Sequence, residues 1–361
     1  MIRARHLVLK SLRRYFDERG YVEVETPYLG RCAAPDPYID PLRVFAADQG
    51  PFYLHTSPEM GMKKLLALGL SRIFQICRVF RVEEFEEHHS TEFTMLEWYR
   101  PGTYVEAMEE TEELIRSVDR ELNSEVVRYA DRPWKVYGLR DLFLEMTTID
   151  PFPLSGEELR ILMGARGVGG LKDNDAWEDL FFKLLIQEIE PRLQEREKGP
   201  FFLKDWPASL TAMAKKKDDC TVERFELYMG GLEIANGYSE LLDREELRMR
   251  MVRDNEERLR LRKETFPLDE AFLDAVSNVH GPVAGVSVGV DRLLMALLGK
   301  ESIGEVLPDR LIPILNQSNI EAPRKKRRRC TVTVHRGADD EGNEDSAELE
   351  LELPCNPQGG V

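Results

Sequence analysis

Three segments of the chain combine charged, aromatic and glycine residues in patterns that could do chemistry. The first places an arginine, acids and aromatic rings on two expected strands, namely Arg81, Glu83, Phe93, Glu97 and Tyr99. The second is an expected hairpin whose fifteen residues 226–240 contain three carboxylates; its candidate residues are Glu226, Glu233, Asn236, Tyr238 and Glu240. The third is the run Gly285-Val286-Ser287-Val288-Gly289-Val290-Asp291-Arg292, whose glycines permit a ligand to approach a strand closely.

Each segment alone is ordinary, because ion pairs on strands and acids on hairpins usually face solvent. Together they suit one ligand. Paired acids supply the oxygen ligands that Mg²⁺ prefers, the planar donor fork of arginine matches phosphate oxygens, and an aromatic ring with a guanidinium can enclose a purine. The set predicts an ATP–Mg²⁺ site without a phosphate-binding glycine loop. The remaining acids Glu59, Glu97 and Glu240 suit a substrate that carries ammonium groups.

The elements that must position these residues follow from hydrophobic periodicity and turn signals. Helices are expected over residues 2–18, 58–68, 104–123, 175–195, 243–262 and 290–298. Strands are expected over 21–26, 52–55, 73–82, 93–99, 201–203, 225–228, 232–236 and 283–288. Because consecutive strands and hairpins dominate the centre, we predict an α+β fold with an antiparallel sheet flanked by helices.

The composition of the chain changes near residue 316. We predict one catalytic domain over 1–316 with a helical insertion at about 102–200, followed by a mostly disordered charged tail over 317–361. Segment 30–50 is rich in Pro, Asp and Gly, which indicates a loop. The glycine-rich run 164–170 is also interpreted as a plain loop, because it follows no clear strand and lacks the Gly-Lys-Ser/Thr ending of a phosphate loop.

Charge and cysteine content narrow the class of protein. The 361 residues include 66 acidic and 50 basic side chains, a formal net charge of −16, which argues against a general polyanion binder. No apolar run approaches the roughly 18–20 residues of a membrane span, and no secretory signal is recognisable. The five cysteines are odd in number and form no CxxC pair, so neither a disulfide framework nor a zinc site is indicated. We expect a reduced, cytoplasmic protein.

The sequence resembles the catalytic domain of class II aminoacyl-tRNA synthetases of the lysyl type. Within that family it is most similar to the short paralogues that attach β-lysine to a lysine of elongation factor P. The resemblance covers about residues 2–308: 20–27 is similar to motif 1, 80–83 with 92–100 to motif 2, and 285–292 to motif 3. Segments 56–59 and 233–241 resemble lysyl-type signatures.

The resemblance implies ATP and Mg²⁺ as cofactors and gives each matching residue a role. Arg81 would hold the α-phosphate, and Arg292 would contact the adenine and the γ-phosphate; these two are the implied catalytic residues. The other implied nucleotide-binding residues are Glu83, His89, Ser90, Phe93, Glu233, Ile234 and Gly289. The implied metal ligands are Glu226 and Glu233. The implied substrate pocket consists of Ser57, Pro58, Glu59, Glu97, Tyr99, Asn236, Tyr238 and Glu240.

The loop 84–91 departs from the family pattern. Lysyl-type synthetases carry Arg-His-Asn-Pro where His88-His89-Ser90-Thr91 stand here. Without that arginine, the γ-phosphate contact falls to His88 or His89, and Ser90 replaces an asparagine that contacts ATP. The change can weaken nucleotide binding.

The implied reaction is in-line attack of a substrate carboxylate on the α-phosphate, which gives an acyl-adenylate and pyrophosphate. It needs positioning and charge neutralisation but no protein nucleophile. We expect transfer to a lysine of elongation factor P rather than to tRNA. The expected first helix begins at residue 2, which leaves no anticodon-binding domain before it, and the acids of loop 84–91 would repel tRNA phosphates. Ser287 replaces a glycine of the synthetases and would reshape the pocket floor.

Two alternatives remain open at this point. The chain could be a truncated lysyl-tRNA synthetase that charges tRNA, or a synthetase-like paralogue without catalysis. The residues do not distinguish lysine from β-lysine. We also predict a homodimer, because motif 1 lies at the subunit interface in this family and the apolar helix 2–18 needs a surface to pack against.

Overall fold

The computed structural model describes residues 1–46, 49–82, 87–124, 126–127 and 133–307, together with two strands at 328–335 and 346–353. The chain divides into the units Met1–Leu311 and Ile312–Val361. In the second unit, β12 (Arg328–His335) and β13 (Ser346–Leu353) form an antiparallel pair. These strands lie within the segment for which we predict a mostly disordered tail, and the domain boundary at 316 stays a prediction.

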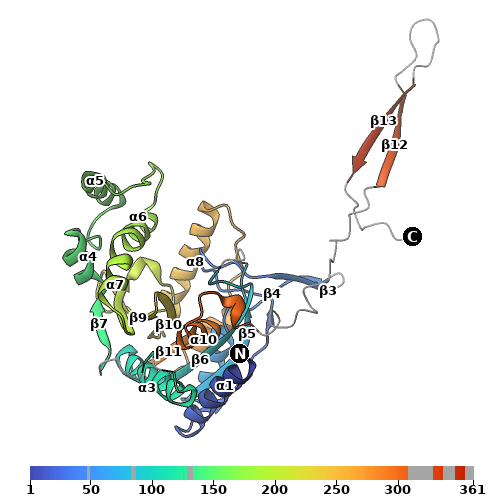
Figure 1. The fold of residues 1–361 in the computed structure, drawn as a ribbon. Coiled ribbons are helices and arrows are strands. Elements are labelled where there is room, and N and C mark those ends of the chain that lie inside the picture. The colour runs from blue at the N-terminus through green and yellow to red at the C-terminus, as the bar shows by residue number, and fades with distance from the viewer. Residues whose placement is uncertain are drawn as a thin grey trace, which may run out of the picture. The chain divides into compact units, whose positions relative to one another are not determined.

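A mostly antiparallel sheet organises the described part of the first unit (Figure 1). In spatial order its eight strands are β1 (Val22–Glu23), β5 (Ile73–Phe80), β6 (Glu92–Pro101), β11 (Val283–Gly289), β10 (Leu232–Ser239), β9 (Thr221–Met229), β8 (Phe201–Pro207) and β7 (Lys135–Gly138). Only the two edge strands run parallel to their neighbours. A smaller sheet contains β2 (Leu29–Gly30), β4 (Gln49–Leu54) and β3 (Arg43–Ala46).

Helices flank the sheet, which confirms the predicted α+β class. The helices of the described residues are α1 (Ile2–Asp17), α2 (Glu59–Leu66), α3 (Tyr104–Leu122), α4 (Leu139–Thr147), α5 (Gly156–Arg166), α6 (Trp177–Leu184), α7 (Glu190–Arg196), α8 (Arg244–Arg260), α9 (Glu270–Val276) and α10 (Val290–Leu298). A π-helical turn, Leu185–Ile189, joins α6 to α7. Short 3₁₀ turns cover Ala208–Leu210 and Ile303–Glu305. None of the helices in the described ranges is long and apolar enough to cross a membrane.

The main core lies between one face of the sheet and helices α1, α3 and α10. Phe16 of α1 stacks on Phe74 of β5 with ring centroids 4.7 Å apart, and it also contacts Trp98 of β6. The apolar face of α1 is therefore buried against the sheet of the same chain. We expect this helix to need a surface to pack against, and the chain's own sheet supplies that surface. Burying this face removes apolar area from water and fixes α1 on the sheet.

A second core holds the insertion together. Helices α4 to α7 pack beside β7 and β8 (Figure 1), around the buried rings of Phe143 and Phe181. Helix α5 begins at a capping box in which Ser155 and Glu158 satisfy each other's backbone N–H groups. The sequence patterns predict no helix at α4 or α5, and the loop predicted over 164–170 is wrong at residues 164–166, which lie inside α5.

Other local predictions differ from the structure at the short strands β1, β3 and β4. The strand expected over 21–26 has only Val22–Glu23 in regular pairing. Segment 30–50, interpreted as a loop, contains β3 and the start of β4. Strand β4 pairs with β2 on one side and with β3 on the other. Because these short strands are defined by this pairing, local composition does not reveal them.

Candidate functional site

The register of the central strands collects the predicted pocket residues on the face of the sheet opposite the main core. One row of directly paired residues crosses five strands and consists of Glu226, Asn236, Ser287, Glu97 and Gln75. The neighbouring row consists of Arg224, Tyr238, Gly285, Tyr99 and Ile73. Residues two apart on a strand share a face, so both rows point to the same side.

A β-bulge brings Glu233 of the hairpin to this face. Strand β10 shifts register against β9 between Glu233 and Ala235, so that Glu233 pairs with Tyr228 whereas Asn236 pairs with Glu226. In an unbroken strand Glu233 and Asn236 would lie on opposite faces. The extra residue, Ile234, is buried, and it allows both polar side chains to face the site.

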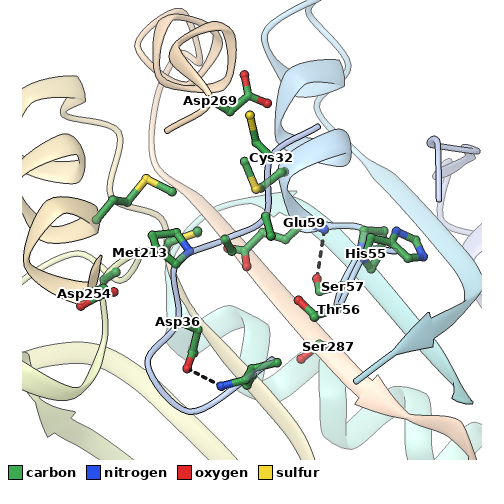
Figure 2. A pocket seen from close by; sticks show the side chains of 18 of the residues that line it. Cys32, Asp36, His55, Thr56, Ser57, Glu59, Met213, Asp254, Asp269 and Ser287 are labelled. Carbon is green, nitrogen blue, oxygen red and sulfur yellow. Dashed lines mark hydrogen bonds between the residues drawn. The ribbon is translucent and has the colours of Figure 1, made fainter. Parts of the chain in front are cut away.

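A cavity of about 1050 Å³ opens over these rows, and all eight residues of the predicted substrate pocket line it. Figure 2 shows Met213 and Asp254 on one side of the pocket and His55, Thr56 and Ser57 on the other. The start of α2 supplies Ser57, Pro58 and Glu59. The Ser57 hydroxyl accepts a hydrogen bond from the Glu59 backbone N–H at 3.0 Å, which fixes the first turn.

Three glutamates share the cavity, and each has defined partners. Glu97 accepts hydrogen bonds from the hydroxyls of Ser57 at 2.8 Å and Tyr99 at 2.6 Å. Glu59 accepts from the Tyr238 hydroxyl and lies 2.5 Å from the ammonium of Lys63. Glu240 Oε2 also lies 2.5 Å from that ammonium. Glu240 Oε1 is buried without a hydrogen-bond partner among the described residues, so it has an acceptor to offer a ligand.

Burial and mutual repulsion disfavour the ionised form of two of these acids, Glu97 and Glu240. Burial, reinforced by the charge of Glu59, raises the pKa of Glu97 to about 7. Burial is also the main cause that raises the pKa of Glu240 to about 8; the Lys63 ammonium opposes it, and the charge of Glu59 adds to it. A ligand with ammonium groups would stabilise the ionised carboxylates and bind with a charge-assisted hydrogen bond.

Gly285 makes the close packing of this pocket possible. A Cβ atom at this position would lie 2.5 Å from Glu240 Oε1 and 2.6 Å from Cε1 of Tyr99. Any side chain would therefore displace a pocket residue. Two positions along β11, Ser287 carries a hydroxyl 3.3 Å from the Asn236 carbonyl oxygen, which places a side chain in the floor as the sequence predicts.

The first predicted nucleotide-binding group lies at the end of β5. Arg81 lines the cavity, and its Nε donates to the Thr56 carbonyl oxygen at 3.2 Å. Its guanidinium carbon lies 5.2 Å from the ring centroid of Phe93. Glu83, which the resemblance places at the adenine, lies outside the described residues. Arg81 is thus close both to the acidic pocket and to the expected purine-binding ring.

The second predicted arginine is held by the loop that departs from the family pattern. Arg292 donates to the carbonyl oxygens of His88 and Glu233, each at 3.3 Å, and lies 2.7 Å from Nε2 of His89. Because arginine can only donate, this imidazole nitrogen is the acceptor. Ser90 is buried and donates its hydroxyl to the Glu92 carbonyl oxygen at 2.9 Å.

The two predicted metal ligands share the site face of the hairpin. Glu226 accepts from Arg224 at 2.6 Å and from the Tyr228 hydroxyl at 3.0 Å. Burial, then the charge of Glu233, raises the pKa of Glu226 to about 8, so a divalent cation would relieve this repulsion. No group of three or more His, Cys, Asp or Glu side chains suited to a metal occurs in the described part of the chain.

The predicted site therefore falls into two parts. The substrate pocket and Arg81 line the cavity. The other described nucleotide and metal residues lie outside its lining, namely His89, Ser90, Phe93, Glu226, Glu233, Ile234, Gly289 and Arg292. Two positively charged residues near the site were not predicted from the sequence. Lys63 was missed although it stands one helical turn after Glu59, and Arg5 was missed because its partners are remote in sequence.

Arg5 supports the nucleotide part from beneath. Its guanidinium donates to Asp291 Oδ1 and to the Thr94 hydroxyl, both at 2.5 Å. The backbone N–H of Thr94 donates to the other oxygen of Asp291 at 2.6 Å. Asp291 directly precedes Arg292, and Thr94 directly follows Phe93, so one buried ion pair fixes the backbone beside both predicted nucleotide contacts.

Comparison with known proteins agrees with this geometry. Residues 1–308 match the family described as tRNA synthetases class II (D, K and N), and the chain belongs to this family. The resemblance found in the sequence is thereby confirmed.

Among individual proteins, the chain is similar to the elongation factor P–(R)-β-lysine ligase of Pectobacterium atrosepticum, with 36% identity over 309 residues, 83% of this chain and 91% of that protein. The ligase of the same name from Erwinia tasmaniensis is 36% identical over 311 residues, 84% of this chain and 92% of that protein. That from Salmonella typhi is 35% identical over 312 residues, with the same coverage.

The buried ion pair of Arg5 gives a stability prediction. In Arg5→Met, Asp291 stays buried without its cation, and the free energy of unfolding should fall by about 3–5 kcal/mol. The matched control is Arg13→Met on the same helix, which removes the exposed ion pair with Glu23 and should cost less than about 1 kcal/mol. Urea denaturation followed by tryptophan fluorescence measures both. Similar small losses in the two variants would contradict the role of Arg5.

Proposed function

We propose that this protein activates lysine or β-lysine with ATP and transfers the aminoacyl group to a lysine side chain of elongation factor P. The observation that carries the proposal is the cavity with the three glutamates Glu59, Glu97 and Glu240, which suits a ligand with two ammonium groups. The names of the similar proteins support the choice of acceptor.

The arrangement supports a division of labour within the reaction. Glu97 and Glu240 would receive the distal ammonium, and Glu59 the amino group nearer the carboxylate. Arg81 lines the same cavity and would hold the α-phosphate beside that carboxylate. In-line attack by the carboxylate oxygen would break the bond to pyrophosphate and form the acyl-adenylate. Positioning of the two reactants is the main catalytic contribution, because no covalent bond to the protein is required.

The hairpin acids suit a magnesium ion. Mg²⁺ commonly binds through one or two carboxylates together with substrate phosphates and water, so Glu226 and Glu233 are a sufficient protein contribution. When bound, the ion would neutralise phosphate charge. Arg292 would add positive charge beside it, since its guanidinium donates to the Glu233 carbonyl oxygen.

Transfer completes the reaction. The ε-amine of the acceptor lysine would attack the acyl carbon of the adenylate, forming an amide and releasing AMP and a proton. The net charge of −16 favours a basic acceptor surface over the phosphates of tRNA. The alternative acceptor, tRNA, is supported by membership of the synthetase family, and the non-catalytic alternative has no observation in its favour beyond the altered loop.

The metal acids provide the first test. Glu233→Gln removes one of two carboxylates at the proposed Mg²⁺ position and should lower ATP–pyrophosphate exchange with lysine or β-lysine by about 100-fold or more, as loss of an electrostatic contact to the transition state does. The exposed Glu245→Gln on α8 is the control and should retain exchange. Unchanged exchange in Glu233→Gln would remove this residue from the site, and no exchange in the wild type would favour a non-catalytic protein.

A second test concerns assembly. We propose a homodimer, supported by the exposed apolar side chains Ile2 and Leu7 on α1 and Val22 on the edge strand β1. Because such exposed apolar residues favour contact with a second copy, light scattering at micromolar concentration should give twice the mass of the 41.7 kDa chain. A monomeric mass at that concentration would contradict the proposal.

The acceptor provides the third test. Enzyme, ATP, Mg²⁺ and either lysine or β-lysine are incubated with elongation factor P in one reaction and with lysine tRNA in another. We expect the mass of elongation factor P to rise by one lysyl unit, because its amine can attack the adenylate directly, while the tRNA stays uncharged. Charged tRNA with unmodified elongation factor P would establish the synthetase alternative instead.

A further inference from the structure

Lys63 lies behind the acidic wall of the pocket: it does not line the cavity, but its ammonium contacts two of the glutamates that do. It stands one turn after Glu59 on α2, and only 3% of its side chain is exposed. Its ammonium lies 2.5 Å from Glu59 Oε1, 2.5 Å from Glu240 Oε2 and 3.6 Å from the sulfur of Met213. It is also 5.4 Å from the ring centroid of Tyr238. The ammonium is therefore enclosed by pocket residues from three separate segments.

A buried ammonium is costly unless carboxylates surround it. Burial opposes the charge of Lys63, but the carboxylates of Glu240 and Glu59 outweigh it and raise the pKa above its usual value. Lys63 is thus a permanent cation of the pocket. When ligand ammonium groups stabilise all three glutamates as carboxylates, these and one lysine leave a net charge of two negative units, which balances the two ammonium groups of lysine or β-lysine.

The position of Lys63 also fixes the length of the pocket. Its ammonium contacts Glu59, which would bind the amino group near the substrate carboxylate, and Glu240, which would bind the distal one. The buried ammonium of Lys63 therefore holds these two carboxylates at a set separation. The third acid, Glu97, is held in place instead by hydrogen bonds from Ser57 and Tyr99.

We propose that Lys63 is a positioning and specificity-determining residue, which sets the net charge and the span of the amino-acid pocket so that it accepts a ligand with two ammonium groups. The inference rests on the proposed function for the identity of that ligand. Lys63 acts through Glu59 and Glu240 and takes no part in nucleotide binding. Loss of Lys63 should therefore weaken binding of the amino acid more than binding of ATP.

The test compares Lys63→Met, Lys63→Gln and Lys63→Arg in the full chain. In ATP–pyrophosphate exchange, Lys63→Met and Lys63→Gln should raise KM for the amino acid at least tenfold and change KM for ATP less than twofold. Lys63→Arg, which keeps the charge, should lie closer to the wild type. Calorimetric titration with lysine and β-lysine in the absence of ATP should show the same order of affinity. The control is Lys135→Met on β7, which lies outside the cavity lining; its ammonium pairs with Glu197 at 2.8 Å, and its loss should leave both KM values within twofold.

The outcomes separate the two proposals. If the wild type neither binds nor activates lysine or β-lysine, the proposed function fails. If the wild type does both but Lys63→Met matches Lys135→Met, or KM for ATP rises in parallel with KM for the amino acid, the role of Lys63 is overturned. Should Lys63→Met fail to fold by circular dichroism, the pair Lys63→Gln and Lys63→Arg decides, and equal KM values in that pair overturn the proposal.

Discussion

A slip of one residue in the pairing of β10 with β11 would turn Asn236 and Tyr238 to the opposite face of the sheet, because side chains alternate along a strand. The amino-acid pocket depends on this register more than on any single contact. The core on the other face supplies the constraint: Phe225, Val286 and Trp98 are buried there and cannot exchange places with polar residues. Hydrophobic burial on one face therefore positions the carboxylates on the other. Gly285 then lets the side chains of Glu240 and Tyr99 approach the sheet closely.

The nucleotide part of the site relies on a different principle. Arg292 contacts the hairpin through the Glu233 carbonyl oxygen and the altered loop through His88 and His89. It thereby joins three segments that are separate in sequence. The bulge at Ile234 serves the same region, since it lets Glu233 share a face with Asn236. The altered loop thus has a structural connection to the predicted catalytic arginine, although it lacks the arginine found in lysyl-type synthetases.

Local patterns were sufficient to predict α1, α3, α8 and the strands that carry Glu97, Asn236 and Ser287. The family resemblance then predicted a pocket whose eight members do line one cavity. The bulge could not be predicted, because it is defined by the pairing of two strands rather than by either strand alone. The contacts of Lys63 and Arg5 were missed for a related reason. Buried ion pairs between remote residues, such as Arg5 with Asp291, leave no periodic signal in the sequence.

The pair of Arg5 with Asp291 joins two residues that are 286 positions apart in the chain. During synthesis at about 5–20 residues per second, the first helix waits roughly 15–60 s before its carboxylate partner is made. Over that interval α1 lacks only α10, because β5, β6 and α3, on which its apolar side packs, belong to the first 122 residues. Closure of the nucleotide part of the site is consequently a late, non-local step of folding, which can occur only after translation has passed the third motif.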